Sequence, residues 1–196
     1  MEEINMKIIL ASGSPRRKEL LKLVVQKFDI MISGVDEKID KDLTVEQQVT
    51  KLSYIKAKDI YEKTDGDRLI IGADTIVVKN NKIYGKPKNK ENAKQIIKEL
   101  LDGDRTHRVL TGLTVIYEKD GEYKEYKLYD EAKIFLKNIS DEEIEKWIAT
   151  GNAMDKAGAY GIQNEFCVHV EKVEGNYMTV LGLPVHKLYD IIKGLI

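Results

Sequence analysis

Short apolar runs typical of β-strands alternate along the chain with segments of helical periodicity, and this alternation limits the possible fold strongly. The run Leu69–Lys79 is rich in isoleucine and valine, as strands are. The segment Val45–Glu62 has apolar residues at Val49, Leu52, Ile55, Ala57 and Ile60, which predicts an amphipathic helix. Because strands and helices follow one another in this way, we expect an α/β fold in which helices pack on a sheet.

Tight turns join several of the expected strands, which predicts a mixed sheet rather than a purely parallel one. Asn80-Asn81 leads from the first long strand into residues 82–84, and Asp120-Gly121 separates strands over 108–117 and 123–136. Further strands are expected over 7–11, 28–33 and 166–172, and further helices over 16–26, 89–101, 140–150 and from 184 onward.

Length and charge exclude several classes of protein. The 196 residues suffice for one domain, 1–196, and the pattern leaves a division into two lobes open. With 32 Lys and Arg against 33 Asp and Glu, we expect neither nucleic acid nor membrane as a general partner. The single Cys167 excludes an internal disulfide. The N-terminal apolar run Ile8–Ala11 is too short for a signal peptide, so a cytoplasmic location is expected.

The stretch ASGSPRRKELL, residues 11–21, follows the first expected strand and begins a helix. Ser14 is a favoured N-cap and Pro15 a favoured first helical residue. Gly13 lets a ligand approach the backbone, while Arg16 and Arg17 could bind phosphate oxygens. Two interpretations stay open, a phosphate-binding turn and an ordinary capped helix with surface arginines. The sequence has no P-loop motif.

Asp74 interrupts the strongly apolar stretch LIIGADTIVV. A carboxylate is costly to bury unless it binds a metal or a donor, or takes part in chemistry. Gly72 and Ala73 leave room beside it. The alternative is an aspartate in a turn between two short strands.

Other charged residues could join Asp74. Taken singly, each is expected to be a solvated surface charge, but together they would suit a triphosphate with a divalent cation. They are Asp36, Glu37, Lys56, Lys58 and Lys86.

The stretch DKAGAYGIQ, residues 155–163, places Gly158 and Gly161 around Tyr160. The Gln163 amide offers a donor and an acceptor, which suits the edge of a nucleobase. The alternative is a glycine-rich turn with a core tyrosine. Three histidines lack metal-ligand spacing and are interpreted as structural: His107, His169 and His186.

The segments LASGSPRRKELL, GADTIVV, GKP, THRVLTG, MDKAGAYGIQ and GLPV occur in the order typical of the Maf family of nucleoside triphosphate pyrophosphatases, which the chain resembles over nearly its whole length. The resemblance implies a single Maf-like domain with a mixed elongated sheet and a deep central cleft, as in the inosine triphosphate pyrophosphatases. It also implies a homodimer that cleaves a nucleoside triphosphate between its α- and β-phosphates with Mg²⁺ or Mn²⁺. The stretch DKAGAYGIQ resembles the subgroup that acts on dTTP and UTP.

The resemblance also implies roles for single residues. Asp74 matches the proton acceptor, and whether it is base, metal ligand or both stays open; Glu37 is the other expected metal ligand. Positions that set substrate preference are matched by Arg16, Thr75 and Gln163. Polar positions that line the cleft are matched by Ser12, Glu37, Lys56 and Lys86, the last three expected to serve catalysis with Asp74.

Two departures and two alternatives remain. The segment LDGDRTH is one residue longer than usual, which we place in a loop, and Asn152-Ala153 stands where relatives often have Glu-Pro.

The alternatives are a pyrophosphatase for unusual purine nucleotides and a non-enzymatic nucleotide-binding regulator of cell division. The stretch GAYGIQ argues against the first, and the acid among the cations argues against the second.

Overall fold

The computed structural model describes residues 6–196, and the chain divides into two compact units. Unit 1 consists of the chain up to Asp74, residues 111–130 and residues 182–196; unit 2 consists of residues 75–110 and 131–181. The first five residues, included in the expected domain 1–196, lie outside the described part. Three strands each contribute residues to both units.

The strands form one mixed sheet, which confirms the expected fold class. Their order is β2-β1-β3-β5-β6-β7, and β4 pairs with β3. β1 is parallel to β2 and β3, whereas β4 is antiparallel to β3 and β7 to β6. The bounds are Lys7–Leu10 (β1), Asp29–Ile30 (β2), Arg68–Lys79 (β3), Lys82–Tyr84 (β4), Thr106–Lys119 (β5), Glu122–Leu136 (β6) and Val170–Gly175 (β7).

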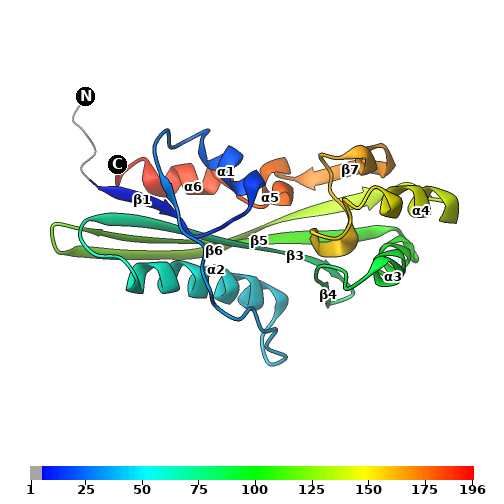
Figure 1. Cartoon of the computed structure of the whole chain (residues 1–196), viewed down its shortest axis with the longest axis horizontal. Helices are drawn as coiled ribbons and strands as arrows, with labels where there is room; N and C mark the ends of the chain where they lie inside the picture. Colours follow the sequence, from blue (N-terminus) through cyan, green and yellow to red (C-terminus); the bar gives the residue numbers. More distant parts are fainter. Residues whose placement is uncertain (1–5) are drawn as a thin grey trace. The chain divides into compact units, whose positions relative to one another are not determined.

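In unit 1, helices cover both faces of the strands. α2 (Val45–Glu62) lies along one face, and α1 (Pro15–Leu21) and α6 (Val185–Ile192) lie on the other (Figure 1). α2 begins at a capping box made by Thr44 and Gln47, which satisfies backbone N–H groups of the first turn. Ala57 and Ile60 on its apolar side belong to a cluster that includes Ile9 of β1 and Ile70 of β3.

Two glycines allow α2 to lie very close to the sheet. A Cβ on Gly72 would lie 2.8 Å from the Ala57 Cβ and would also clash with the Ser53 carbonyl oxygen. A Cβ on Gly112 would clash with the Val49 carbonyl oxygen. The space beside Asp74 that we expected at Gly72 is therefore filled by the backbone of α2.

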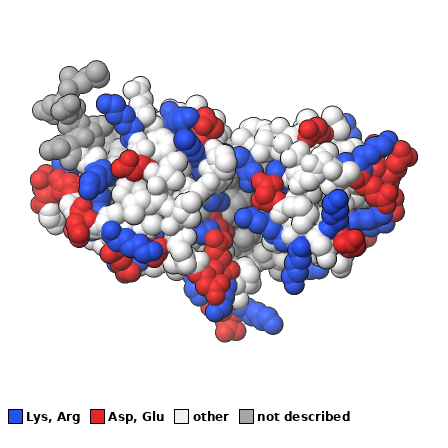
Figure 2. Space-filling view, viewed as in Figure 1, with Lys and Arg blue, Asp and Glu red and all other residues white. Residues whose placement is uncertain are grey.

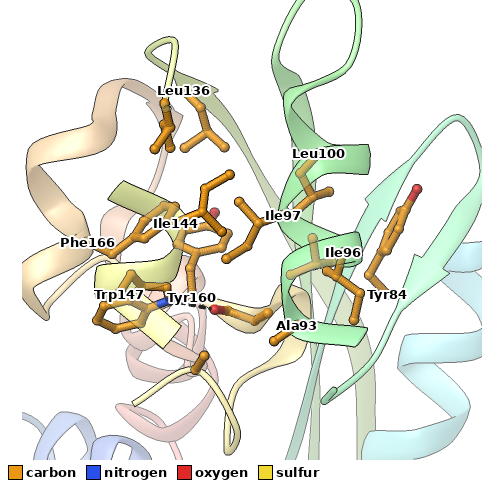
Figure 3. Close-up of a cluster of buried hydrophobic side chains, with 14 of the residues drawn as sticks. Tyr84, Ala93, Ile96, Ile97, Leu100, Leu136, Ile144, Trp147, Tyr160 and Phe166 are labelled. Atoms are coloured by element: carbon orange, nitrogen blue, oxygen red, sulfur yellow. Dashed lines mark hydrogen bonds between the residues drawn. The ribbon is translucent and has the colours of Figure 1, made fainter. Parts of the chain in front are cut away.

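Unit 2 has its own apolar core, built from α3 (Lys90–Leu101), α4 (Asp141–Ala149) and the strands beside them (Figure 3). Trp147 and Phe166 pack against each other with ring centroids 5.4 Å apart. Lysines of α3 pair with acids of α4, and Figure 2 shows both signs of charge gathered over these helices. α4 begins at a capping box, in which Ser140 and Glu143 bond each other's backbone N–H.

Several sequence predictions were wrong in detail. The first helix ends at Leu21 rather than at residue 26, and Ser14 occupies its N-cap without a side-chain capping bond. The strand expected over 166–172 is a 3₁₀ helix, η2 (Glu165–His169), followed by β7. Two short elements were not expected, η1 (Ala157–Ala159) and α5 (Tyr177–Leu181). Within residues 6–196, no helix combines the length and the apolar character that a membrane span requires.

Candidate active site

Asp74 lies inside β3 and is only 7% exposed, so it does not occupy a turn between two strands. Lys56 of α2 is also buried, and its Nζ donates to Oδ1 of Asp74 at 2.5 Å. The same ammonium lies 2.9 Å from Oε1 of Glu37, whose side chain is 54% exposed. The structure thus brings one buried and one exposed carboxylate to a single lysine.

The close packing of α2 on β3 explains this ion pair. Alternate residues of a strand face the same side, so Gly72 and Asp74 both face α2. Because Gly72 has no side chain, the helix backbone comes near enough for Lys56 to reach the carboxylate. Burial of either charge alone would be unfavourable, and their pairing offsets much of that penalty.

Arg17 connects the start of α1 to the segment that precedes α6. Its Nε donates to the Gly182 carbonyl at 2.8 Å, and its Nη1 donates to Oγ of Ser12 at 3.1 Å. Burial lowers the pKa of the Arg17 guanidinium, whereas the nearby charge of Asp74 raises this pKa. An arginine stays protonated under these influences, so Arg17 holds a fixed positive charge beside the carboxylate.

The other predicted site residues are distributed over both units. In unit 1, Ser12 is buried after β1 and Arg16 is half-buried on α1. Thr75 follows Asp74 in β3 and is the first residue of unit 2. Lys86 and Gln163 are exposed in loops of unit 2, so Lys86 is less enclosed than its turn suggested.

The loop of unit 2 that contains Lys86 is bonded to the glycine-rich stretch. The backbone N–H of Gly158 donates to the Gly85 carbonyl at 3.1 Å. Gly158 has φ = 71°, a left-handed conformation that favours glycine, and its position against Val77 leaves little room for a side chain. The stretch GKP and the stretch DKAGAYGIQ therefore meet within one unit.

Sequence reasoning missed the specific role of Arg17. It treated Arg16 and Arg17 alike and carried only Arg16 into the set of site residues. The stretch GLPV was noted in the sequence, and its first residue, Gly182, accepts the bond from Arg17. Nothing in the sequence indicated that the two stretches meet. A contact between residues 165 positions apart leaves no periodicity in the sequence.

Few carboxylates in the described part of the chain are grouped so that they could hold a cation. Within residues 6–196, no three His, Cys, Asp or Glu side chains form a cluster suited to a metal ion. The pair that remains is Glu37 and Asp74, joined by Lys56.

The chain is similar to known proteins over nearly its whole length. Residues 7–195 match the model of the Maf-like protein family. The chain is 48% identical over 188 residues to a protein of Alkaliphilus metalliredigens named dTTP/UTP pyrophosphatase, covering 95% of this chain and 94% of that one. A protein of Lachnoclostridium phytofermentans with the same name is 44% identical, covering 95% and 93%.

The fold resembles that of a solved structure of low sequence identity. The Ham1 protein of Staphylococcus aureus is 12% identical, with 97% of this chain and 100% of that chain covered and a TM-score of 0.50. That likeness supports the fold alone. The match over residues 7–195 and the identity to curated relatives show that the chain belongs to the family of Maf-like proteins.

Proposed function

We propose that this protein is a nucleoside triphosphate pyrophosphatase that hydrolyses dTTP and UTP to the monophosphate and pyrophosphate. The observation that carries the proposal is the buried Asp74 carboxylate, held by Lys56 and flanked by the charge of Arg17. Relatives at 44–48% identity bear the name dTTP/UTP pyrophosphatase, which supports the choice of substrates.

Asp74 is suited to accept a proton from water. Its Oδ1 bonds Lys56, and a carboxylate has further acceptor sites on both oxygens. In the proposed reaction, water attacks the α-phosphorus, its proton passes to Asp74, and the bond from the α-phosphorus to the bridging oxygen breaks. Pyrophosphate then leaves. Proton transfer to a positioned base contributes roughly 10²- to 10⁴-fold to a rate.

The cations of unit 1 would neutralise the charge of the triphosphate. Lys56 and Arg17 are fixed by their partners, so they need little reorganisation when charge builds up on the phosphate oxygens. α1 has only seven residues, and we therefore assign phosphate binding to the side chains of Ser12, Arg16 and Arg17 rather than to the helix end. Lys86, exposed in unit 2, stays a predicted catalytic cation.

The donor set fits a divalent cation. Mg²⁺ is usually held by one or two carboxylates together with phosphate oxygens and water, and Glu37 and Asp74 approach the same ammonium group closely. These two residues would hold Mg²⁺ or Mn²⁺. When bound, the cation would supply further neutralisation of phosphate charge.

Recognition of the base is assigned to Gln163. Gln163 is exposed, so its amide is free to meet the N3–H and a carbonyl of uracil or thymine. Thr75 and Arg16 are the other proposed determinants of substrate preference. A homodimer and a cytoplasmic location stay predictions.

A panel of triphosphates tests the proposal. The purified protein with Mg²⁺ or Mn²⁺ is given dTTP, UTP, CTP, GTP and ITP, and pyrophosphate and orthophosphate are measured separately. We expect pyrophosphate and monophosphate in equal amounts, with dTTP and UTP preferred. Orthophosphate with a nucleoside diphosphate as the only products, or a preference for purines, would overturn it.

A further inference from the structure

A hydrogen bond in the core of unit 2 joins two residues that the proposed reaction does not use. His107 of β5 and Tyr160 are 2% and 6% exposed, and Nε2 of His107 lies 2.6 Å from the Tyr160 hydroxyl. The two rings also meet edge to face, with centroids 5.5 Å apart. The bond spans 53 positions of sequence and connects THRVLTG to DKAGAYGIQ.

Tyr160 lies three residues before Gln163, in a segment held at several points. Its ring packs on Phe166 with centroids 4.8 Å apart, and the Trp147 indole N–H donates to the Ala159 carbonyl at 2.9 Å (Figure 3). Gly158 donates to the loop that contains Lys86. The chain that leads to Gln163 is thus tied to β5, to α4 and to that loop.

The backbone of this segment is strained. Ala159 has φ = 62°, a left-handed conformation that residues with a Cβ rarely adopt. Such a conformation persists only where surrounding contacts determine it. The bond from Trp147 holds Ala159, and the bond from His107 holds the next residue, Tyr160.

The core of unit 2 is otherwise apolar around His107 and Tyr160, so a hydrogen-bonded polar pair is unusual there. A phenylalanine at 160 and an aliphatic residue at 107 would fill a similar volume without burying polar groups. A hydrogen bond adds what apolar packing lacks, a fixed direction for the tyrosine and for the backbone attached to it. Burial, assisted by the nearby charge of Lys79 and opposed by that of Asp104, lowers the pKa of His107 to about 3. The ring is therefore neutral at pH 7, and its bond to Tyr160 involves no net charge.

We propose that His107 and Tyr160 are positioning residues that set the place of Gln163 and thereby the choice of nucleobase. Neither residue is proposed to touch the triphosphate. The inference rests on the proposed function, because it assigns to Gln163 the recognition of the base. Loss of the buried hydrogen bond would let the segment shift, and the amide of Gln163 would then meet the right and wrong bases with more similar affinity.

The test compares kcat/KM for dTTP and CTP in Tyr160→Phe, which keeps the ring and its packing on Phe166. We expect the ratio of the two values to fall roughly tenfold, the effect of one buried hydrogen bond. The kcat for dTTP at saturation should change less than the ratio. His107→Leu should behave in the same way, and His107→Gln, which can still bond the hydroxyl, should restore part of the ratio.

A double variant shows whether the effect passes through Gln163. In a Gln163→Ala background, Tyr160→Phe should leave the dTTP to CTP ratio unchanged, because the amide that it positions is gone. A further fall in that background would overturn the proposed route.

Ile97→Val is the matched control for general loosening of the core. Ile97 is fully buried in the same apolar cluster, on α3, and the variant removes one methylene. It should lower the melting temperature and leave the base ranking as it is. If the dTTP to CTP ratio shifts equally in Ile97→Val, or stays unchanged in Tyr160→Phe, the positioning role is overturned. The proposed function is not affected by either result. A wild-type protein that does not discriminate among bases overturns the proposed function itself.

Discussion

Asp74 and Lys56 form a buried ion pair at the centre of the candidate site. Removal of two charges from water carries a large penalty, and an apolar residue in place of Lys56 would take this ion-pair partner away from the buried Asp74 carboxylate. Glu37 gives Lys56 a second, exposed partner. This second partner lets the chemistry of Asp74 be tested apart from its contribution to the fold.

Asp74→Asn keeps the shape of the side chain and removes its charge and basicity. We expect kcat to fall by about 10²-fold or more, the range of a general base. The protein should still fold, because Lys56 keeps its ion pair with Glu37. The control is Glu62→Gln, which neutralises an exposed acid on α2, the helix that carries Lys56. This variant should retain normal turnover. Normal turnover in Asp74→Asn would contradict the assignment of the base.

Arg17→Lys keeps a positive charge and loses the planar group that bonds Gly182 and Ser12 together. We expect KM to rise roughly tenfold for every triphosphate, because lysine cannot make both bonds in a fixed geometry. Lys18→Arg, on the exposed side of the same helix, should change nothing. Steady-state kinetics with dTTP and GTP would check this, and a change for only one of the two nucleotides would contradict a role in phosphate binding.

At the scale of elements, the packing of α2 on β3 determines the site. The helix approaches the strand at Gly72, and this approach sets the distance from Lys56 to Asp74. A glycine inside a strand usually weakens it, so its presence indicates a close contact with another backbone.

Gly72→Ala should therefore affect stability and activity together. The added methyl would lie within 3 Å of the Ala57 Cβ and force α2 away from the strand. We expect a loss of about 1–3 kcal/mol in the free energy of unfolding, as for other overpacked sites, and a lower kcat. Urea denaturation would measure the loss. Gly194→Ala, where the added methyl meets nothing within 4 Å, should leave stability nearly unchanged.

Local signals predicted the elements well, and contacts distant in sequence were not predictable from it. α2 has the bounds that its apolar spacing predicted, and α4 begins where Ser140 and Glu143 form a capping box, a signal that lies within one helical turn. The strand expected over 166–172 begins only at Val170, because Phe166 belongs to the apolar core through contacts with Trp147 and Tyr160, which override its β propensity. The pairing of Lys56 with Asp74 required the packing of a helix on a strand, which periodicity does not specify.

At the scale of the whole molecule, the buried neutral His107 links stability to pH. Its pKa is about 3 in the folded protein, against an ordinary value of 6.5. Below pH 6.5 the unfolded chain binds a proton that the folded protein does not bind until about pH 3. The contribution of the neutral His107 ring to the free energy of unfolding is thus complete above pH 6.5. It is lost as pH falls from 6.5 toward 3.

His107→Gln should reduce this dependence. Between pH 6 and pH 4 the stability of the wild type should fall more steeply than that of the variant, by up to about 1.4 kcal/mol per pH unit. Protonation of paired carboxylates also destabilises the protein in acid, but these pairs are present in both proteins. The difference between the two pH dependences of stability therefore isolates His107. Urea midpoints across this range would check it, and equal slopes would contradict a buried neutral imidazole.

The bond from Arg17 to Gly182 has a consequence for synthesis of the protein. Unit 1 takes its first residues from the start of the chain and its last from 182–196, after all of unit 2 has been made. On the ribosome, Arg17 and Ser12 emerge long before the carbonyl that orients the guanidinium. An incomplete nascent chain therefore lacks the finished phosphate-binding arrangement, and truncated products should be inactive toward cellular nucleotides.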